Sequence, residues 1–390
     1  MRFDIQKMIL TQCAVCATEL GLSLGKKCGR CSTRYCGAAC QVRHWKEGGH
    51  DKLCKQIKRS GGAEQYNANI KYTEAVAVAA EACADDTKGQ TCFICTQALH
   101  WKTKEGLVRG CSCRGTSGFA HVSCLAEQAK ILYAEAEENN LAWKMKIARW
   151  ERWEKCSLCE QQYHGVVSCA LGWGCWKTYV GRPEGDMPRI MAMNLLGNGL
   201  DTAGRHEDAL PVREAGLAMR LRLGESEDAI LGTRGNLALT YEKLGRLEQS
   251  LTIRREVYSG RLRLNGNEHE ETLRAANNYA VTLRDLQRFG EAKSLLRKPM
   301  LVARRVLGEN DDLTLRMRWM YAQSIYRDPG ATLDDFREAV TTLEEIERTA
   351  RRVLGGAHPT TTEIEKAIEL LRLLRASEKV VAVTAKYFPG

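Results

Sequence analysis

Cysteine is the residue type in this sequence with the clearest capacity for chemistry. There are 17 cysteines, of which 15 precede Glu160, and most of them form closely spaced pairs. Such pairs form disulfides in small secreted proteins and bind metal ions in intracellular ones. Residues 1–10 lack the apolar core of a secretory signal peptide, and histidines are interspersed among the cysteines. The sequence therefore predicts zinc sites with thiolate and imidazole ligands.

The first group of candidate ligands consists of seven cysteines and one histidine in four pairs. Four pairs supply two tetrahedral sites with no open position, which is typical of structural rather than catalytic zinc. Binding at each closed site contributes roughly 10–16 kcal/mol of apparent folding free energy, so a short segment with a small core can fold. His44 lies close to His50, but only His50 precedes a cysteine by three intervening residues. The predicted ligands are Cys13, Cys16, Cys28, Cys31, Cys36, Cys40, His50 and Cys54.

The segment RYCGAACQVRHWKEGGHDKLCK, residues 34–55, resembles the second half of a MYND finger. Tyr35 precedes a cysteine, Gln41 follows the next one, and Trp45 precedes the histidine. The resemblance covers residues 13–54 and implies interleaved ligation, with the first and third pairs on one ion and the second and fourth on the other. MYND fingers bind short peptides that often contain proline, and they do no chemistry. A purely architectural zinc knot is the alternative.

A second group of eight candidate ligands follows, with four cysteines, one histidine and three cysteines in that order. This order admits a RING-CH domain or a PHD finger. The one-residue spacing of the second pair and the segments CSCRGTSGFAHVSCL (111–125) and CSLCEQQYHG (156–165) resemble a RING-CH domain. The resemblance covers residues 91–165 and again implies that alternate pairs share an ion, which makes four zinc ions in all. The predicted ligands are Cys92, Cys95, Cys111, Cys113, His121, Cys124, Cys156 and Cys159.

RING-CH domains recruit a ubiquitin-conjugating enzyme charged with ubiquitin and promote transfer to a substrate lysine. The resemblance implies that zinc makes two loops rigid, that these loops form a shallow apolar groove, and that catalysis consists of positioning. Ile94, just before the second ligand in CFIC, matches the apolar residue that contacts the conjugating enzyme. Its alternative role is to fill the core. The resemblance predicts a ubiquitin ligase whose other modules select the substrate.

Two residues depart from the RING-CH pattern. Gln128 stands where an aromatic groove residue is common, and Glu160 stands where many active domains place a cation that contacts ubiquitin. A carboxylate cannot donate the hydrogen bonds required there. Trp153 either substitutes for the missing aromatic residue or packs beside the last zinc pair. The 31 residues between Cys124 and Cys156 are long for the family and predict inserted helix. These departures motivate an alternative, a non-enzymatic adaptor that mediates protein interactions.

From about residue 181 onward a helical repeat with a period of 42 residues takes over, marked by Asn194, Asn236 and Asn278. The segment NLALTYEKLGRLEQSLTIRREVYSGRL shows two amphipathic helices around a Gly-Arg turn. It resembles the 42-residue tetratricopeptide repeats of kinesin light chains. Stacked repeats form a solenoid with a groove that binds peptides. The recurring asparagines either contact a ligand in this groove or form hydrogen bonds within and between helices.

Together these patterns predict a mainly α-helical chain, with two small zinc-stabilised cross-brace modules followed by an α-solenoid. The predicted parts are a MYND finger at 13–54, a partly helical linker at 55–90, a RING-CH domain at 91–165 and the repeats at 182–378. A MYND-bearing lysine methyltransferase is excluded, because other modules claim the chain between and beyond the fingers.

Charge and hydropathy restrict the partners. The formal net charge of +10 invites a nucleic-acid interpretation, but 14 thiolates and four zinc ions would reduce it to about +4, so nucleic acid is not favoured. No apolar stretch approaches the roughly 20 residues of a membrane helix. Cys83, Cys169 and Cys175 fit no ligand pair and are interpreted as unreactive thiols. We expect a soluble intracellular protein in the cytoplasm, with the nucleus as the alternative.

Overall fold

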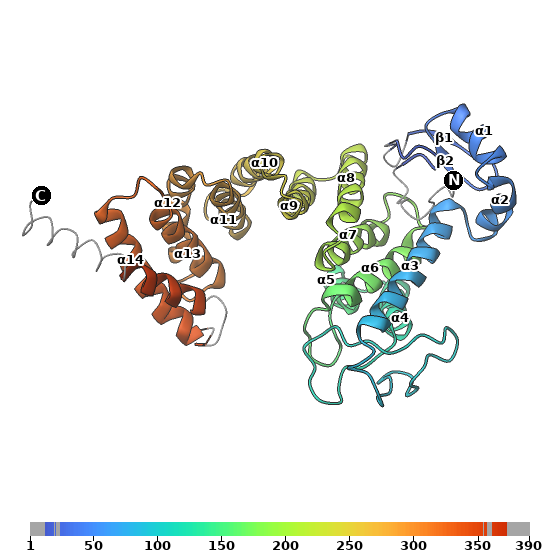
Figure 1. Ribbon diagram of the computed structural model, residues 1–390, viewed down its shortest axis with the longest axis horizontal. Helices are drawn as coiled ribbons and strands as arrows, with labels where there is room; N and C mark the ends of the chain where they lie inside the picture. Colours follow the sequence, from blue (N-terminus) through green and yellow to red (C-terminus); the bar gives the residue numbers. More distant parts are fainter. Residues whose placement is uncertain (1–11, 19, 21–23, 354, 357–360, 373–390) are drawn as a thin grey trace, which may run out of the picture. The chain divides into compact units, whose positions relative to one another are not determined.

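The computed structural model describes residues 12–18, 20, 24–353, 355–356 and 361–372. The chain divides into two compact units, Met1–Glu225 and Ser226–Gly390. Helices dominate both units (Figure 1). The cysteine-rich modules lie in the first unit. The predicted fold class, mainly α with cysteine-rich modules before a helical solenoid, is confirmed. In the part of the chain that the structure describes, no helix is long and apolar enough to span a membrane.

The N-terminal segment of the first unit is a short hairpin followed by two helices. Strand β1 (Lys26–Lys27) pairs antiparallel with β2 (Arg34–Tyr35), and helices α1 (Ala38–Lys46) and α2 (His50–Arg59) follow. Four of the nine residues in the local core cluster are cysteines, and the cluster includes the buried Tyr35. A core with so few aliphatic side chains stabilises a fold only weakly, so metal binding must contribute most of its stability.

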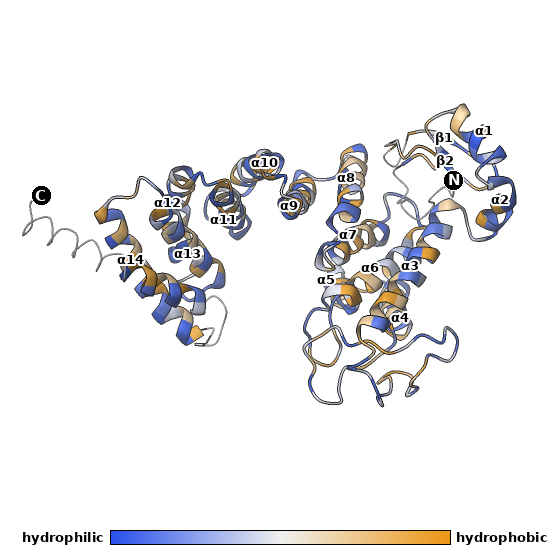
Figure 2. Ribbon diagram, viewed as in Figure 1, coloured by the Kyte–Doolittle hydropathy of each residue, from blue (hydrophilic) through white to orange (hydrophobic). Residues whose placement is uncertain are grey.

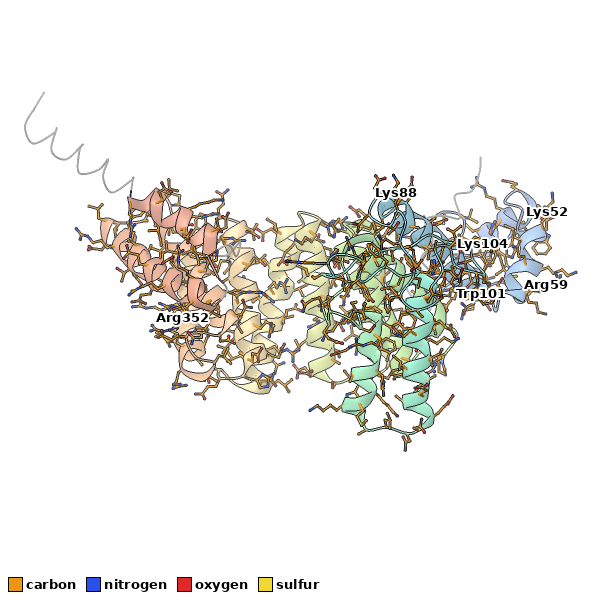
Figure 3. All side chains as sticks on the ribbon, turned by 90° about the horizontal axis from the view of Figure 1, so that it is seen from below. Lys52, Arg59, Lys88, Trp101, Lys104 and Arg352 are labelled. Atoms are coloured by element: carbon orange, nitrogen blue, oxygen red, sulfur yellow. The ribbon has the colours of Figure 1, made fainter. Side chains whose placement is uncertain are left out.

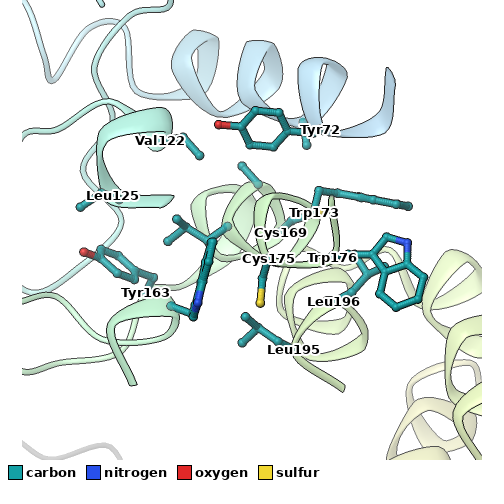
Figure 4. Packing of buried hydrophobic residues seen from close by; sticks show 14 of the residues in the cluster. Tyr72, Val122, Leu125, Tyr163, Cys169, Trp173, Cys175, Trp176, Leu195 and Leu196 are labelled. Carbon is teal, nitrogen blue, oxygen red and sulfur yellow. The ribbon is translucent and has the colours of Figure 1, made fainter. Parts of the chain in front are cut away.

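Helix α6 lies at the centre of the rest of the first unit, in contact with α3, α4 and α7. Most of its residues are buried, since it is apolar on every side. Figure 4 shows Trp173 and Trp176 of α6 among side chains of neighbouring helices. The close contact with α7 requires glycine at Gly199, where a Cβ atom would lie 2.7 Å from the carbonyl oxygen of Ser168. The helices of this part of the unit, in chain order, are α3 (Ala63–Ala82), α4 (Val122–Glu138), α5 (Trp143–Trp150), the 3-10 helix η2 (Glu151–Trp153), α6 (Gly165–Tyr179), α7 (Met187–Thr202) and α8 (His206–Arg222).

Helix α3 occupies most of the segment that the sequence suggests as a linker. Its Gln65 side chain donates to the carbonyl oxygen of Lys177 on α6 (2.8 Å), and its Glu64 pairs with Arg189 on α7 (2.9 Å). Near the middle of α3, the Tyr72 hydroxyl lies 2.9 Å from the Ser123 hydroxyl at the start of α4. The segment is therefore packed into the unit as well as connecting its modules.

The second unit is a series of helices in which each packs against the next, and α11 also packs against α13. Along each helix, hydrophobic and hydrophilic residues are interspersed (Figure 2). Leu231, Leu273 and Leu315, which recur at the 42-residue spacing, are all buried. The helices are α9 (Glu227–Lys243), α10 (Leu247–Asn265), α11 (Glu270–Asp285), α12 (Phe289–Val306), α13 (Asp312–Tyr326) and α14 (Leu333–Val353).

The turns within successive helix pairs share one backbone conformation. At the end of α9, the N–H of Gly245 donates to Glu242 (3.0 Å), and Gly245 has a φ of 72°. At the end of α11, the N–H of Gln287 donates to Arg284 (2.8 Å), with a φ of 59°. Both turns end a helix through a left-handed residue, the conformation that favours glycine. The Gly-Arg turn of the repeat is thus preserved even where glutamine replaces glycine.

Candidate metal centres

The described residues contain four clusters of four side chains whose candidate ligand atoms lie within 4.8 Å of one another. Each cluster joins two pairs that are not consecutive in the sequence, as the two resemblances imply. All sixteen ligands expected from the sequence are brought together in this way. The clusters are Cys13, Cys16, Cys36 and Cys40; Cys28, Cys31, His50 and Cys54; Cys92, Cys95, His121 and Cys124; and Cys111, Cys113, Cys156 and Cys159.

The four Cys-x-x-Cys pairs share one backbone turn. The residue after the second cysteine donates its N–H to the carbonyl oxygen of the first cysteine, at 2.8–3.1 Å. The first cysteine in turn donates its N–H to the carbonyl five residues later, also at 2.8–3.0 Å. The residue after the second cysteine has a positive φ of 55–61° in every case. These residues are Ala17, Ser32, Thr96 and Glu160.

We call each such turn a knuckle. Because the turn directs two sulfur atoms toward one point, it prepares half of a tetrahedral site. The two knuckles of residues 92–95 and 156–159 match those of residues 13–16 and 28–31 in both hydrogen bonds and φ. The second module therefore has the same local basis for binding zinc as the first.

The two ligand histidines use different ring nitrogens. Nδ1 of His121 lies 3.3 Å from Cys95 Sγ, while its Nε2 lies 3.3 Å from the carbonyl oxygen of Ala98. An Nε2–H that donates to this carbonyl leaves Nδ1 deprotonated and available to a metal ion. In the first module, Nε2 of His50 is the nitrogen near sulfur, 3.4 Å from Cys31 Sγ.

His44, the competitor of His50, belongs to none of the clusters. Its Nδ1 lies 3.0 Å from the Tyr35 hydroxyl, and its ring centroid lies 4.8 Å from that of His50. Burial, with the nearby imidazole of His50 as a smaller cause, lowers the pKa of His44 to about 4. A neutral His44 therefore supports the His50 ring by packing and by its hydrogen bond to Tyr35.

A carboxylate fixes the helix that carries Cys124. Glu105 accepts hydrogen bonds from the backbone N–H of Ser123 (2.7 Å) and from its hydroxyl (2.8 Å). The helix α4 has no side-chain cap of its own at His121, so Glu105 satisfies an N–H of its first turn. Since Tyr72 of α3 also contacts the Ser123 hydroxyl, this network links the third cluster to α3.

Two knuckles of the second module expose one apolar residue each. Ile94 is 36% exposed and Leu158 is 52% exposed, and each occupies the position before the second cysteine. The backbone N–H of Ile94 lies 3.4 Å from Cys92 Sγ, and that of Leu158 lies 3.4 Å from Cys156 Sγ. Leu158 was not singled out from the sequence, although its place in CSLC is the counterpart of Ile94 in CFIC.

Trp153 is a correction to the sequence-based set of partner-binding residues. Its side chain is 1% exposed and packs in the core with Trp150 and Tyr179, so a partner cannot reach it. The alternative interpretation was that Trp153 packs beside the last zinc pair, and its side chain lies in the same buried cluster as Cys156 of that pair. Gln128 on α4 is partly buried.

An exposed tryptophan nearby was also missed. Trp101 is 68% exposed (Figure 3) and lies in a turn from His100 to Glu105. The hydrogen bonds of this turn, His100 N–H to Glu105 and Lys104 N–H to His100, repeat those of a knuckle, and Lys104 has a φ of 58°. Here Nδ1 of His100 accepts from the Thr103 N–H (3.1 Å) in place of a sulfur. Sequence spacing gave no signal for this turn, because no cysteine marks it.

The three recurring asparagines differ in their surroundings. The Asn194 side-chain oxygen accepts a hydrogen bond from Arg213 (2.9 Å), as does that of Asn198 (2.7 Å). Asn194 thus forms a hydrogen bond between α7 and α8, the alternative considered for these residues. Asn236 and Asn278 are partly buried, on α9 and α11 respectively.

Two family models match parts of the chain. The model of the MYND finger matches residues 13–54, the segment that holds the first two clusters. The model of the tetratricopeptide repeat matches residues 228–299, which include most of α9 to α12.

Similarity to an individual curated protein is limited to a short segment. Ubiquitin carboxyl-terminal hydrolase 19 of Arabidopsis thaliana is 46% identical over 72 residues, which are 18% of this chain and 10% of that relative. The chain therefore spans about a tenth of the length of this curated relative.

Among solved structures, a putative kinesin light chain of Podosopora anserina with nearly identical TPR-like repeats is similar at 16% identity and a TM-score of 0.41. That similarity covers 60% of this chain and 97% of that one. The protein BtubC (BKLC) of P. vanneervenii is similar at 12% identity and a TM-score of 0.33, covering 66% and 92%. The chain contains a MYND finger and tetratricopeptide repeats, and it is a zinc-binding protein with these two modules of protein interaction.

Proposed function

We propose that the protein is a ubiquitin ligase that recruits a ubiquitin-conjugating enzyme through its second zinc module, while its MYND finger and repeats bind substrate or partner peptides. The proposal divides the chain into the MYND finger (13–54), a connecting helical segment (55–90), a RING-CH domain (91–165) and the repeats (182–378). The observation that carries it is the matched exposure of Ile94 and Leu158 on two knuckles of one module.

We further propose that each of the four clusters holds one zinc ion. The donors fit this ion, since each cluster offers four sulfur or imidazole ligands and no carboxylate. Four protein ligands leave no open coordination position, so the ions would make the loops rigid and would not activate water or substrate. The cluster of Cys28, Cys31, His50 and Cys54 is buried at all four ligands, and its three thiolates with one zinc ion would leave a net charge of only −1, which lowers the cost of burying it.

The two exposed knuckle residues suit a shallow apolar groove. Hydrogen bonds from the Ile94 and Leu158 N–H groups to sulfur fix both backbones relative to their clusters. A partner that covered both side chains would bury the 36% of Ile94 and the 52% of Leu158 that are exposed, and would gain only that share of the roughly 1.5–3 kcal/mol that burial of a fully exposed aliphatic side chain contributes. Groups held in this way let the module orient a bound conjugating enzyme without taking part in bond-making.

A second candidate function, a non-enzymatic adaptor, has its own supporting observation. Glu160, at the position where a cation is expected in an active domain, is 61% exposed and bound to Arg152. A carboxylate accepts hydrogen bonds but does not donate them. If ubiquitin must be held at this position by a donor, the module would bind a conjugating enzyme without promoting transfer.

The proposal is tested by reconstituting ubiquitination with activating enzyme, a panel of conjugating enzymes and ubiquitin. The intact, zinc-loaded protein is compared with Ile94→Ala, Leu158→Ala and the control Val78→Ala, which truncates an exposed aliphatic residue on α3. We expect chains with the intact protein and the control, and a loss of at least several-fold with either knuckle variant. No chains with any conjugating enzyme, from protein that binds one through Ile94 and Leu158, would favour the adaptor. No binding of any conjugating enzyme would reject the ligase proposal and leave an adaptor for other partners.

A further inference from the structure

The four clusters differ in charge. Two of them contain four cysteines, and two contain three cysteines and one histidine. With one Zn²⁺, four thiolates leave a net charge of −2, whereas three thiolates and a neutral imidazole leave −1. Sulfur atoms in a more negative site give up electron density more readily to an oxidant. On this ground the two all-cysteine clusters are the more reactive pair.

Exposure separates these two clusters from each other. In the first, Cys16 and Cys36 are both exposed. In the second all-cysteine cluster no thiol is exposed, and Cys111 and Cys156 are buried. That cluster is also covered by backbone at Gly118, where an added Cβ would lie 2.9 Å from Cys113 Sγ. A small oxidant in water therefore meets sulfur first at the cluster of Cys13, Cys16, Cys36 and Cys40.

The exposed thiols of this cluster are also neighbours. Cys16 Sγ lies 3.5 Å from Cys36 Sγ. Cys16 ends a knuckle, and Cys36 lies just before α1, so the two come from separate backbone segments. Cys40 Sγ lies 3.5 Å from Cys36 Sγ, but Cys40 is on the helix and is less exposed.

We propose that the site formed by Cys13, Cys16, Cys36 and Cys40 is a thiol-oxidation site for small hydroperoxides, at which Cys16 and Cys36 form a disulfide and the zinc ion is released. This inference depends on the zinc loading proposed above and not on ligase activity.

The reaction balances with hydrogen peroxide as the oxidant. The thiolate of Cys16 or Cys36 attacks one peroxide oxygen, the O–O bond breaks, and the departing hydroxide is protonated to water. The resulting sulfenic acid is then attacked by the other thiolate. An S–S bond forms, the S–O bond breaks, and a second hydroxide leaves as water. Two thiolates lose two electrons in total and peroxide gains two, with two protons taken from solvent. The zinc ion, left with two thiolates, dissociates.

The structural effect would be local. The neighbouring cluster of Cys28, Cys31, His50 and Cys54 is fully buried and shares no ligand with the oxidised site. The Cys16–Cys36 disulfide would keep the second half of the knuckle of residues 13–16 joined to the residues just before α1, whereas Cys13 and Cys40 would lose their common ion. The hydrogen bond from the Ala14 N–H to the Arg34 carbonyl (3.1 Å) would also remain. Oxidation would therefore release the Cys13 end of the knuckle while α1 and α2 stay folded.

The test uses the full zinc-loaded chain and measures the zinc content before any oxidant is added, which checks the loading separately. About one equivalent of hydrogen peroxide is added, and the released zinc is followed with a chromogenic chelator. Free thiols are alkylated under denaturing conditions, disulfides are then reduced and labelled with a heavier alkylating agent, and peptides are mapped by mass spectrometry. We expect one zinc ion per chain in the first phase and heavy label at Cys16 and Cys36. First-phase label at any of the other clusters, or at Cys36 with Cys40, would overturn the proposal.

Cys36→His is the matched variant, because it keeps four ligands and lowers the site's charge to that of a three-cysteine site. We expect it to hold the same amount of zinc as the intact chain and to release the first ion several-fold more slowly. Hydrogen exchange gives an independent readout, in which amides of residues 13–18 lose protection in the oxidised intact chain and those of residues 92–159 keep it. Equal release rates in the variant and the intact chain would contradict the assignment. If the variant fails to load zinc, the mapping on the intact chain still decides.

Discussion

Arg152 binds Glu160 through two parallel hydrogen bonds, from Nη1 to Oε1 at 3.0 Å and from Nη2 to Oε2 at 2.6 Å. Arg152 belongs to η2 in the segment inserted between Cys124 and Cys156, and Glu160 ends the last knuckle. The hydrogen bonds from Arg152 lower the pKa of Glu160, and the same bonds raise the pKa of Arg152. The pair therefore attaches the inserted helices to the knuckle that exposes Leu158.

This pair gives a test of the ligase proposal. In Glu160→Arg the new cation would be repelled by Arg152 and would project into solvent beside the knuckle. We expect ubiquitin-chain formation to rise relative to the intact protein if a donor is needed at this position. Glu160→Gln, which removes the charge and keeps the shape, is the control and should have a smaller effect. Because exposed ion pairs contribute about 0–1 kcal/mol, neither variant should unfold the module. Unchanged chain formation in Glu160→Arg would support the adaptor.

The knuckle turns predict a stabilising substitution. Thr96 has a φ of 61°, a conformation that is costly for a β-branched residue and is free of steric cost for glycine. Thr96→Gly should therefore stabilise the second module by roughly 1 kcal/mol, seen as a higher melting temperature at constant zinc. Thr87→Gly is the control, since Thr87 is not among the residues with positive φ and glycine there only adds entropy to the unfolded chain. A melting temperature lowered by Thr96→Gly would mean that the threonine side chain contributes more than its strain costs.

The second unit should show acid sensitivity that depends on Glu242. Burial alone would raise the pKa of Glu242, but hydrogen bonds and charge from Arg254 outweigh it and lower the pKa. Its carboxylate accepts from Arg254 Nε and Nη2, both at 3.0 Å, and from Ser250 (2.9 Å). A lowered pKa means that this group stabilises the fold above its unfolded pKa of about 4.3 and that the contribution is lost as pH falls through the folded value.

The measurement compares the intact protein with Glu242→Gln by urea denaturation of the second unit between neutral pH and about pH 3. The variant should be less stable at neutral pH, because Arg254 keeps a buried charge without a counterion. The difference between the two proteins should shrink as pH falls. A difference that stays constant down to low pH would show that the carboxylate is not ionised in the folded protein.

Whether the recurring asparagines contact a peptide can be decided by measuring peptide capture and the melting temperature separately. If Asn236 and Asn278 contact a peptide, Asn236→Ala with Asn278→Ala should abolish capture of partner peptides under conditions where the variant is still folded. Asn194→Ala is the contrast, because its side chain is bound to Arg213 and its loss should lower stability by about 1 kcal/mol. Unchanged capture together with a lower melting temperature in the double variant would reject the groove assignment.

The sequence predicted best what depends on spacing along the chain. The resemblance to a RING-CH domain implied that Cys92, Cys95, His121 and Cys124 share one site, and the structure brings these four side chains together. The 42-residue repeat, which the sequence did predict, accounts for the burial of Leu273 and Leu315, because each repeat must bury the same face against its neighbours.

The sequence did not predict contacts between segments that are far apart in the chain. From the sequence, Trp153 was a candidate for an aromatic residue at the surface, but packing with Tyr179 of α6 buries its side chain. The hydrogen bond between Gln65 and Lys177 joins residues 112 positions apart, and neither residue has a pattern that announces it. The pairing of Arg152 with Glu160 depends on how the inserted helices fold back, which periodicity does not specify. Tertiary packing, rather than local propensity, decided each of these cases.

The packing of α3 against α4 and α6 limits which fragments of the protein can fold alone and which can be exchanged during evolution. Ala75, Val76 and Ala79 of α3 are buried in the core that also contains α6, so a fragment cut after Ala82 would leave apolar surface of α6 in water. Exposed apolar surface of this kind promotes aggregation. The helix α3 is therefore a poor candidate for separation from the second zinc module during gene rearrangement. Because α7 packs against α6 and α8 packs against α7, selection would be expected to keep α3 to α8 together as one heritable block.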